Sequence, residues 1–212
     1  MKRFTFSVFC CGVAAILSVA PAKGGDPDFS FTAPGGAVPS IGGKDEGISV
    51  FPLFMNDTQS DLGPLAVHPL PNIASLELVL TGLTHTNAAD LDIYLIDPFG
   101  KTLEIMTDRG VGFGLAGVNL IFNDTAASMT PEAAQIVNGT YLPEDSNSTG
   151  GFSKYIGGTG GTDAWILLVI DDSPGDQGGL ESFTLRGTVP EPVSLSLLAL
   201  GALTALHRRR RK

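Results

Sequence analysis

The chain has 212 residues, of which 22 are acidic and 13 basic, so its net charge at pH 7 is −9. Seven of the bases lie in the two terminal segments, which leaves residues 23–190 with six bases and 21 acids, a net charge of −15. So acidic a surface argues against binding to nucleic acid or to anionic membranes. It suits solubility outside the cell, or cation binding. The 168 residues between the terminal segments suffice for one domain with a sizeable core.

The N-terminus has the three parts of a secretory signal peptide. Met1–Arg3 is basic, Phe4–Val19 is apolar, and Ala20 and Ala22 frame an A-x-A cleavage site. We therefore expect the secretory translocon to export the chain and cleavage to follow Ala22, so that residues 1–22 are removed.

The only two cysteines, Cys10 and Cys11, lie inside this apolar region. The exported protein then has no disulfide, no thiol nucleophile and no thiolate metal site. It has to hold its fold by core packing alone.

The segment after the signal peptide predicts a flexible leader over residues 23–47, because it is rich in Gly and Pro and has little periodicity. From Ile48 the pattern is that of β-structure. Asp97–Gly100 has the residues of a tight turn and predicts a hairpin. Alternating or apolar runs predict strands at Ser75–Leu80, Leu91–Leu95, Thr102–Met106, Val118–Phe122, Trp165–Ile170 and Ser182–Arg186.

Two stretches depart from simple alternation. Trp165–Ile170 is apolar throughout, which predicts a strand buried on both faces with Trp165 in the core. Pro131–Val137 is mildly helical in character. Together the runs indicate an all-β domain over residues 48–188, an antiparallel jelly-roll β-sandwich of about eight short strands.

An ordered series of short motifs runs from Val67 to Thr188. The motifs are Leu83–Thr86, Ala89–Leu91, Leu95–Thr102, Phe122–Ala126, Ala164–Val169 and Asp171–Leu180. The series resembles the P domain (Homo B domain) of proprotein convertases. This resemblance implies an eight-stranded jelly roll and gives His85 the place of the family's structural histidine. Ala89 and Asp97 depart from the family pattern, which affects local loop geometry.

P domains usually follow a subtilisin-like catalytic domain, and no such domain is visible in this sequence. The histidines are His68, His85 and His207, and no G-x-S-x-G elbow is present. A Ser-His-Asp triad needs its three groups in mutual contact. We therefore expect no catalytic residues and no enzyme activity.

Acidic side chains gather in one Gly-rich turn, at Asp171, Asp172 and Asp176. Calcium takes six to eight oxygen ligands, commonly from such loops, so these three are the candidate calcium ligands. The alternative is that each Asp caps its turn with its own side chain. Apart from calcium, no cofactor is expected.

A saccharide is a second candidate ligand, because jelly rolls often bind carbohydrate through exposed aromatic side chains. Phe113, Tyr141, Phe152 and Tyr155 lie in predicted loops. The alternative for these four is packing beneath the long loop of residues 127–161.

The C-terminus, residues 189–212, combines Pro190-Glu191-Pro192, an apolar run over Val193–Leu206 and five consecutive bases. Fourteen helical residues span about 21 Å, short of the roughly 30 Å of a bilayer core. Snorkelling bases extend that reach and keep the basic end cytoplasmic. The alternative is a buried amphipathic helix with a solvated basic tail. The bases are Arg208, Arg209, Arg210, Arg211 and Lys212.

This order of motif, apolar span and basic stop resembles the PEP-CTERM sorting signal of exopolysaccharide-producing Gram-negative bacteria. The resemblance implies recognition by an exosortase-type membrane transpeptidase, which removes the anchor. We then expect a chain that is membrane-anchored at least transiently and ends at the cell surface or outside the cell.

Two functions follow. The first is an exported, non-catalytic β-sandwich with an adhesive or structural role, partnered by exopolysaccharide or surface proteins and with calcium as candidate stabilising ion. The second is an accessory domain that assists a separate subtilisin-like serine endopeptidase.

Overall fold

The computed structural model describes residues 29–39, 47–54, 72–148, 150–158, 160–161 and 163–190. The predicted signal peptide and the apolar and basic parts of the C-terminal segment lie outside these ranges. The elements in chain order are β1 (Phe29–Pro34), β2 (Ala37–Val38), β3 (Ile48–Phe54), β4 (Ser75–His85), η1 (Ala88–Asp90), β5 (Leu91–Ile96), β6 (Thr102–Met106), β7 (Leu115–Phe122), β8 (Gly139–Tyr141), η2 (Glu144–Asn147), η3 (Gly151–Tyr155), β9 (Ala164–Asp171), β10 (Gly178–Gly179) and β11 (Ser182–Thr188).

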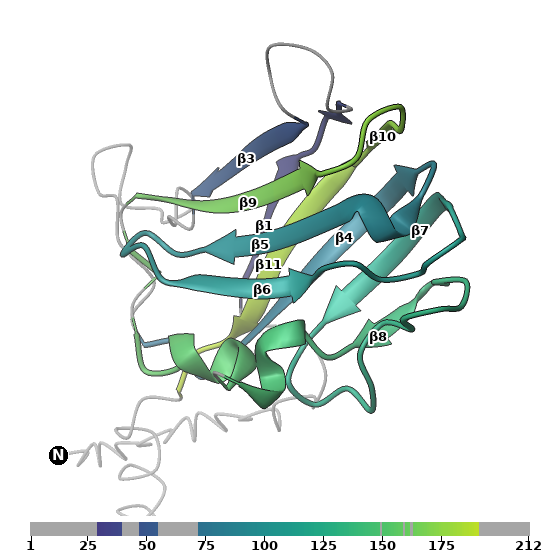
Figure 1. Ribbon diagram of the computed structural model, residues 1–212. Helices are drawn as coiled ribbons and strands as arrows, with labels where there is room; N and C mark the ends of the chain where they lie inside the picture. The colour runs from purple at the N-terminus through teal and green to yellow at the C-terminus, as the bar shows by residue number, and fades with distance from the viewer. Residues whose placement is uncertain are drawn as a thin grey trace, which may run out of the picture.

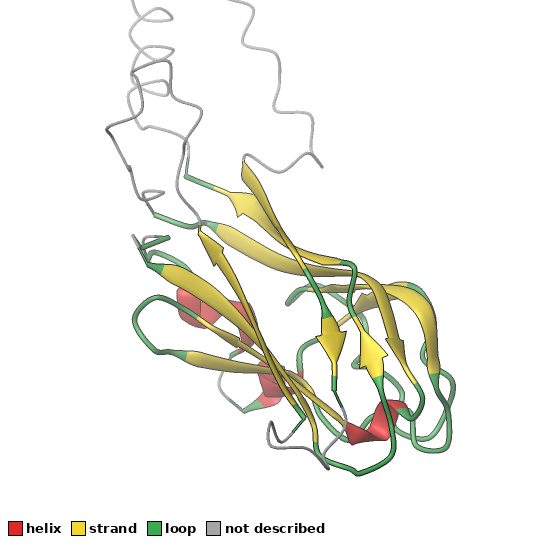
Figure 2. Ribbon diagram, turned by 90° about the horizontal axis from the view of Figure 1, so that it is seen from above, coloured by secondary structure: helices red, strands yellow, loops and turns green. Residues whose placement is uncertain are grey.

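The strands form two sheets that face each other (Figures 1 and 2). The large sheet has the order β1-β11-β4-β10-β2, with β7 also pairing with β4 and β8 with β7. The small sheet has the order β3-β9-β5-β6. Every pair of strands is antiparallel except β7 and β8, which run parallel. The prediction of an all-β protein with two antiparallel sheets is confirmed, with eleven short strands in the described residues where about eight were expected.

The core between the sheets follows from alternation. In β4, Leu76, Leu78 and Leu80 are buried, and their register partners on β11 include buried Phe183 and Leu185. Aliphatic and aromatic side chains of alternate positions therefore meet between the sheets, as in other sandwiches. The strands predicted at Ser75–Leu80 and Ser182–Arg186 are confirmed.

The predicted hairpin forms between β5 and β6. Asp97 organises its turn, because its carboxylate oxygen Oδ1 accepts the backbone N–H groups of Phe99 at 2.9 Å and Lys101 at 2.7 Å. Gly100 has φ of +81°, a conformation in which glycine is favoured. The turn that joins β5 to β6 is thus determined by residues that are close together in the chain.

Strand β9 corrects one expectation. Trp165, Leu167 and Val169 are buried, with Trp165 in the core as predicted. The alternate residues, from Ile166 to Ile170, are only half-buried. The strand is therefore buried on one face and not on both, because an antiparallel sheet in a two-layer sandwich has a single face against the core.

Two further expectations are corrected. The leader predicted over residues 23–47 contributes β1, which pairs with β11 and buries Phe29 and Ala33, and the short β2. The stretch 131–137 is not helical, since the carbonyls of Pro131 and Glu132 accept N–H groups from residues 110 and 111. Long-range pairing overrides the local pattern in both places.

The expected membrane helix over Val193–Leu206 lies outside the described residues. Within the described part of the chain, no helix has the length and apolar character that crossing a bilayer requires.

Gly187 tests the packing of β11 against β4. A Cβ atom there would lie 2.9 Å from Cζ of Phe29 and would collide with the carbonyl of Ser75. We expect Gly187→Ala to lower the free energy of unfolding by about 1–3 kcal/mol, as overpacking does. Urea denaturation measures the change. Gly179→Ala is the matched control, because its nearest atoms lie 3.4 Å or more from the added Cβ. Equal stability of the two variants would contradict this account.

Candidate functional site

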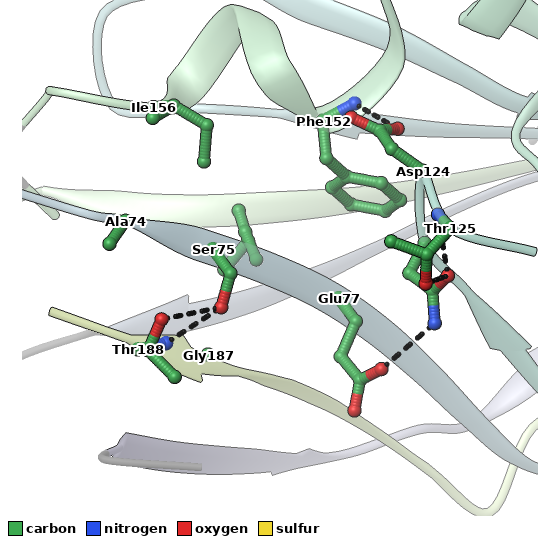
Figure 3. A pocket seen from close by; sticks show the side chains of 11 residues that line it. Ala74, Ser75, Glu77, Asp124, Thr125, Phe152, Ile156, Gly187 and Thr188 are labelled. Carbon is green, nitrogen blue, oxygen red and sulfur yellow. Dashed lines mark hydrogen bonds between the residues drawn. The ribbon is translucent and has the colours of Figure 1, made fainter. Parts of the chain in front are cut away.

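A groove of about 460 Å³ lies where β4 begins and β11 ends (Figure 3). Its volume falls within the roughly 300–1,000 Å³ of small-molecule pockets. We call η3 together with its C-cap residue Ile156 the η3 segment. This segment carries Phe152 and lies over the strand that carries Ser75 and Glu77. Its lining residues are Ala74, Ser75, Leu76, Glu77, Asn123, Asp124, Thr125, Phe152, Ile156, Gly187 and Thr188.

Glu77 stands on the outward side of β4 and is held by two partners. Arg186, its register partner on β11, forms an ion pair with it. The side-chain amide of Asn123 donates to its Oε2 at 3.1 Å. The Glu77 charge is thereby compensated, and one wall of the groove becomes a fixed set of polar groups.

Asp124 fixes the opposite wall. Its Oδ1 accepts the N–H of Phe152 at 2.8 Å, and its Oδ2 accepts the N–H of Ser153 at 2.7 Å. The Asp124 carboxylate thus caps the start of this helical turn, where it accepts the Phe152 N–H and shares the Ser153 N–H with the carbonyl of Gly150. Asp124 thus holds the η3 segment, and with it Ile156, over the groove.

The lining of the groove combines apolar and polar side chains. Phe152 is buried, whereas Ile156 is 43% exposed. The hydroxyls of Ser75 and Thr188 lie 2.7 Å apart and the Thr188 N–H donates to the Ser75 hydroxyl at 3.1 Å. Preformed polar groups beside an aliphatic surface suit a neutral, hydroxyl-rich ligand, while the Asp124 carboxylate disfavours an anionic one.

His85 lies far from this groove, at the other end of β4. Its Nε2 is 3.3 Å from Oδ2 of Asp171 and its Nδ1 is 2.6 Å from the carbonyl of Asn87. The side chains of His85 and Asp171 are fully buried. Nδ1 thus faces backbone groups of Asn87, and Nε2 faces the Asp171 carboxyl group. Both ring nitrogens are occupied, so this pair has no free position for a nucleophile.

The three candidate calcium ligands have different surroundings. Asp171 is buried and its second oxygen accepts the N–H of Ser173 at 3.1 Å. Asp172 is exposed, and Asp176 accepts the hydroxyl of Thr86 at 2.5 Å. In the described residues no three His, Cys, Asp or Glu side chains are placed to hold a metal ion together. Calcium binding through Asp171, Asp172 and Asp176 stays a prediction of the sequence.

The carboxyl groups of Asp176 and Asp90 influence each other's pKa. Burial, and then a hydrogen bond with Asp176, raise the pKa of Asp90. Hydrogen bonds from Thr86 and with Asp90 lower the pKa of Asp176. The first proton that this pair takes up therefore goes to Asp90. Asn87 adds a hydrogen bond of 2.8 Å to Asp90 and completes a polar network at this end of the sandwich.

The four loop aromatics divide between the two interpretations. Phe152 and Tyr155 are buried, which confirms packing beneath the long loop for this pair. Phe113 is 40% exposed and Tyr141 is half-buried. Of the sorting motif only Pro190 is described, and it is exposed. Glu191, Pro192, the bases at Arg208–Lys212 and the cleavage residues Ala20 and Ala22 lie outside the described residues.

Sequence reasoning missed the groove. Ser75 and Glu77 were visible only as the polar half of an alternating strand, which is the ordinary pattern of a solvent-facing side. Asp124 lies in the motif Phe122–Ala126, and that motif was the one signal in the sequence for this region.

No protein-family model matches the chain, and no curated protein matches it. Among solved structures, the serine protease of Aeromonas sobria in complex with the chaperone is similar, with a TM-score of 0.37 and 14% identity. The same protease without that partner gives a TM-score of 0.35 and 14% identity. Each comparison covers 75% of this chain and 27% of the protease, so the chain spans about a quarter of the length of these structures. We transfer no activity and no residue role on this similarity.

The buried pair at the end of β4 and β9 gives a second prediction. Asp171→Asn removes the carboxyl group that faces Nε2 of His85, and removing one partner of a buried hydrogen bond costs about 1–3 kcal/mol. We expect a loss of that size in the free energy of unfolding, measured by urea denaturation. The double variant His85→Leu/Asp171→Leu should lose less free energy of unfolding than the sum of the losses of His85→Leu and Asp171→Leu. Exposed Asp163→Asn is the control and should stay within about 0.5 kcal/mol of the parent. Additive single effects would show that the pair is not coupled.

Proposed function

We propose that this chain is an exported, non-catalytic binding module that attaches to neutral saccharide of the exopolysaccharide matrix through the groove between β4, β11 and η3. The observation that carries the proposal is the groove itself, about 460 Å³ and lined by fixed polar groups and apolar side chains. An adhesive role outside the cell agrees with the acidic, cysteine-free composition of residues 23–190.

A binding role is favoured over catalysis by how the polar groups of the site are used. Glu77 is paired with Arg186, and both oxygens of Asp124 accept backbone N–H groups. The described histidine, His85, is buried at the far end of β4. A nucleophile, a base and an orienting acid in mutual contact, which acyl transfer needs, are not found together among the described residues.

The terminal signals supply the route in this proposal. The signal peptide would lead to the translocon, and Pro190–Pro192 with the apolar span and bases would be handled by an exosortase-type transpeptidase. The β-sandwich, in the jelly-roll form that the P-domain resemblance implies, would be the part delivered to the cell surface or the matrix.

The ordered motifs from Val67 to Thr188 favour one second candidate, an accessory domain that docks on a separate subtilisin-like endopeptidase. Pull-down from the producing cell separates the two. A subtilisin-like protease among the captured proteins supports the second candidate, whereas polysaccharide supports the first.

Ile156 tests the groove. We expect the parent protein to be retarded in affinity electrophoresis through gels that contain a neutral glucan, mannan or galactan. Ile156→Glu should weaken that retardation at least tenfold, because a charge would replace an apolar side chain that lines the groove. Val137→Glu is the matched control, since Val137 is 56% exposed and lies outside the groove. Retardation by none of these polysaccharides, or equal retardation of both variants, would contradict the saccharide proposal.

The C-terminus tests the route. In a Gram-negative host that contains an exosortase, we expect intact-mass spectrometry of the exported chain to show an end near Pro192. In the same host without the exosortase, the chain should still end at Lys212. A chain that ends at Lys212 in both hosts would refute processing at the motif and leave the groove proposal standing.

A further inference from the structure

The outer faces of the two sheets differ in chemistry. On the large sheet the outward positions are mostly polar, as Thr184 and Arg186 of β11 and Glu77 of β4 illustrate. On the small sheet the outward positions are mostly aliphatic. Polar outward faces are the usual pattern for a sandwich in water, so the aliphatic outward face of the small sheet calls for an explanation.

The register places the aliphatic side chains in adjacent rows. Val50 of β3 pairs with Leu168 of β9, which pairs with Tyr94 of β5. The rows on either side are Ile48 with Ile170, and Pro52 with Ile166 and Ile96. Ile48 is 46% exposed and Val50 is 55% exposed. We call these residues the outer apolar face: Ile48, Val50, Pro52, Tyr94, Ile96, Ile166, Leu168 and Ile170. The small sheet lies at the front in Figure 1, where no described element covers it.

Acidic groups border the outer apolar face. Asp92 lies in the same row as Ile170. Partial burial, and then the charges of Asp108, Asp172 and Glu104, raise the pKa of Asp92 to about 6. Each of these three neighbours is itself acidic, so among the described residues the charges that act on Asp92 are negative.

The described cations are engaged elsewhere. Arg109 pairs with Glu144, Lys154 with Asp145, and Arg186 with Glu77. Lys101, the fourth, directs its ammonium group to the carbonyl of Lys154 at 3.4 Å. Within the described ranges, then, none of these four basic side chains forms an ion pair with the acidic border.

We propose that the outer apolar face is a docking surface for a polypeptide segment that presents alternating aliphatic and Lys or Arg side chains. The aliphatic side chains would cover the Val50–Leu168–Tyr94 row, and the basic side chains would meet the carboxylates of the border. This partner goes beyond the saccharide proposal, because it uses the small sheet and the groove lies on the large one.

Charge selects this occupant over others. A second copy of the chain would bring the same acidic border against its own. An anionic bilayer would be repelled by it, and a neutral saccharide lacks the aliphatic side chains that the face would bury. Pro52 also lacks an N–H at the free edge of β3, where antiparallel geometry directs the groups of even-numbered residues away from β9. Edge pairing is thereby weakened, and contact through the face is favoured.

The probe is a fluorescein-labelled octapeptide of alternating Leu and Lys, titrated with the full chain in fluorescence anisotropy. We expect it to bind, and we expect Leu168→Thr to weaken binding at least tenfold. Val50→Thr, at a 55% exposed position where misfolding is not a concern, should weaken it about threefold. Val79→Thr is the matched control, because Val79 is half-buried on the outward side of the large sheet and should leave binding unchanged. Asp92→Asn should weaken binding at pH 7.5 and have little effect at pH 5.

Several results would overturn the proposal. These are absence of peptide binding, equal binding of an octapeptide of Ser and Lys, and an equal effect of Val79→Thr. Sedimentation that shows a dimer dispersed by Leu168→Thr would assign the face to a second copy instead. Ile156→Glu should leave peptide binding intact and Leu168→Thr should leave saccharide binding intact, so failure here is distinguishable from failure of the groove.

Discussion

The buried contact between His85 and Asp171 joins the two sheets, and the rest of the structure depends on that junction. His85 ends β4 in the large sheet, and Asp171 ends β9 in the small sheet. A buried pair is costly to break and exacting in geometry, so it fixes one relative placement of the sheets. Around it, Asp171 also accepts the Ser173 N–H and donates its own N–H to Gly47. The polar network at this end is therefore structural, although its composition resembles part of a catalytic triad.

The opposite end of the sandwich is closed by packing and carries the groove. Tyr155 packs edge-on against Trp165 with ring centroids 5.0 Å apart, and its hydroxyl donates to the carbonyl of Leu95 at 3.1 Å. Asp124 holds the same η3 segment from the other side. One short segment thus both closes the core and forms a wall of the groove. The buried His85–Asp171 pair therefore lies at one end of the sandwich, and the groove lies at the other.

Local patterns predicted the parts of the fold that depend on local chemistry. Ser75–Leu80 alternates and is a strand, and Asp97 organises the turn that its sequence predicts. The prediction of a flexible leader over residues 23–47 was wrong, because β1 is ordered by pairing with β11, about 150 residues away in the chain. The prediction for Trp165–Ile170 was correct for the strand and wrong for the burial of its second face. Its uniform apolar character indicates a strand correctly, but composition cannot say whether the second face is covered by a neighbour in this chain or is left for a partner.

By itself, the sequence determined the strand periodicity, the acidic charge, the absence of cysteine from residues 23–190 and the turn chemistry, since each of these depends on residues close together in the chain. It also carries the terminal motifs from which an export route is inferred. Only the tertiary structure decided that Asp171 is paired with His85. It likewise decided that Glu77, Asp124 and Ile156 share one groove, and that of the two apolar sides of β9 the one with Ile166, Leu168 and Ile170 faces outward. These are contacts between distant segments, and they exist only once the two sheets have been packed in register.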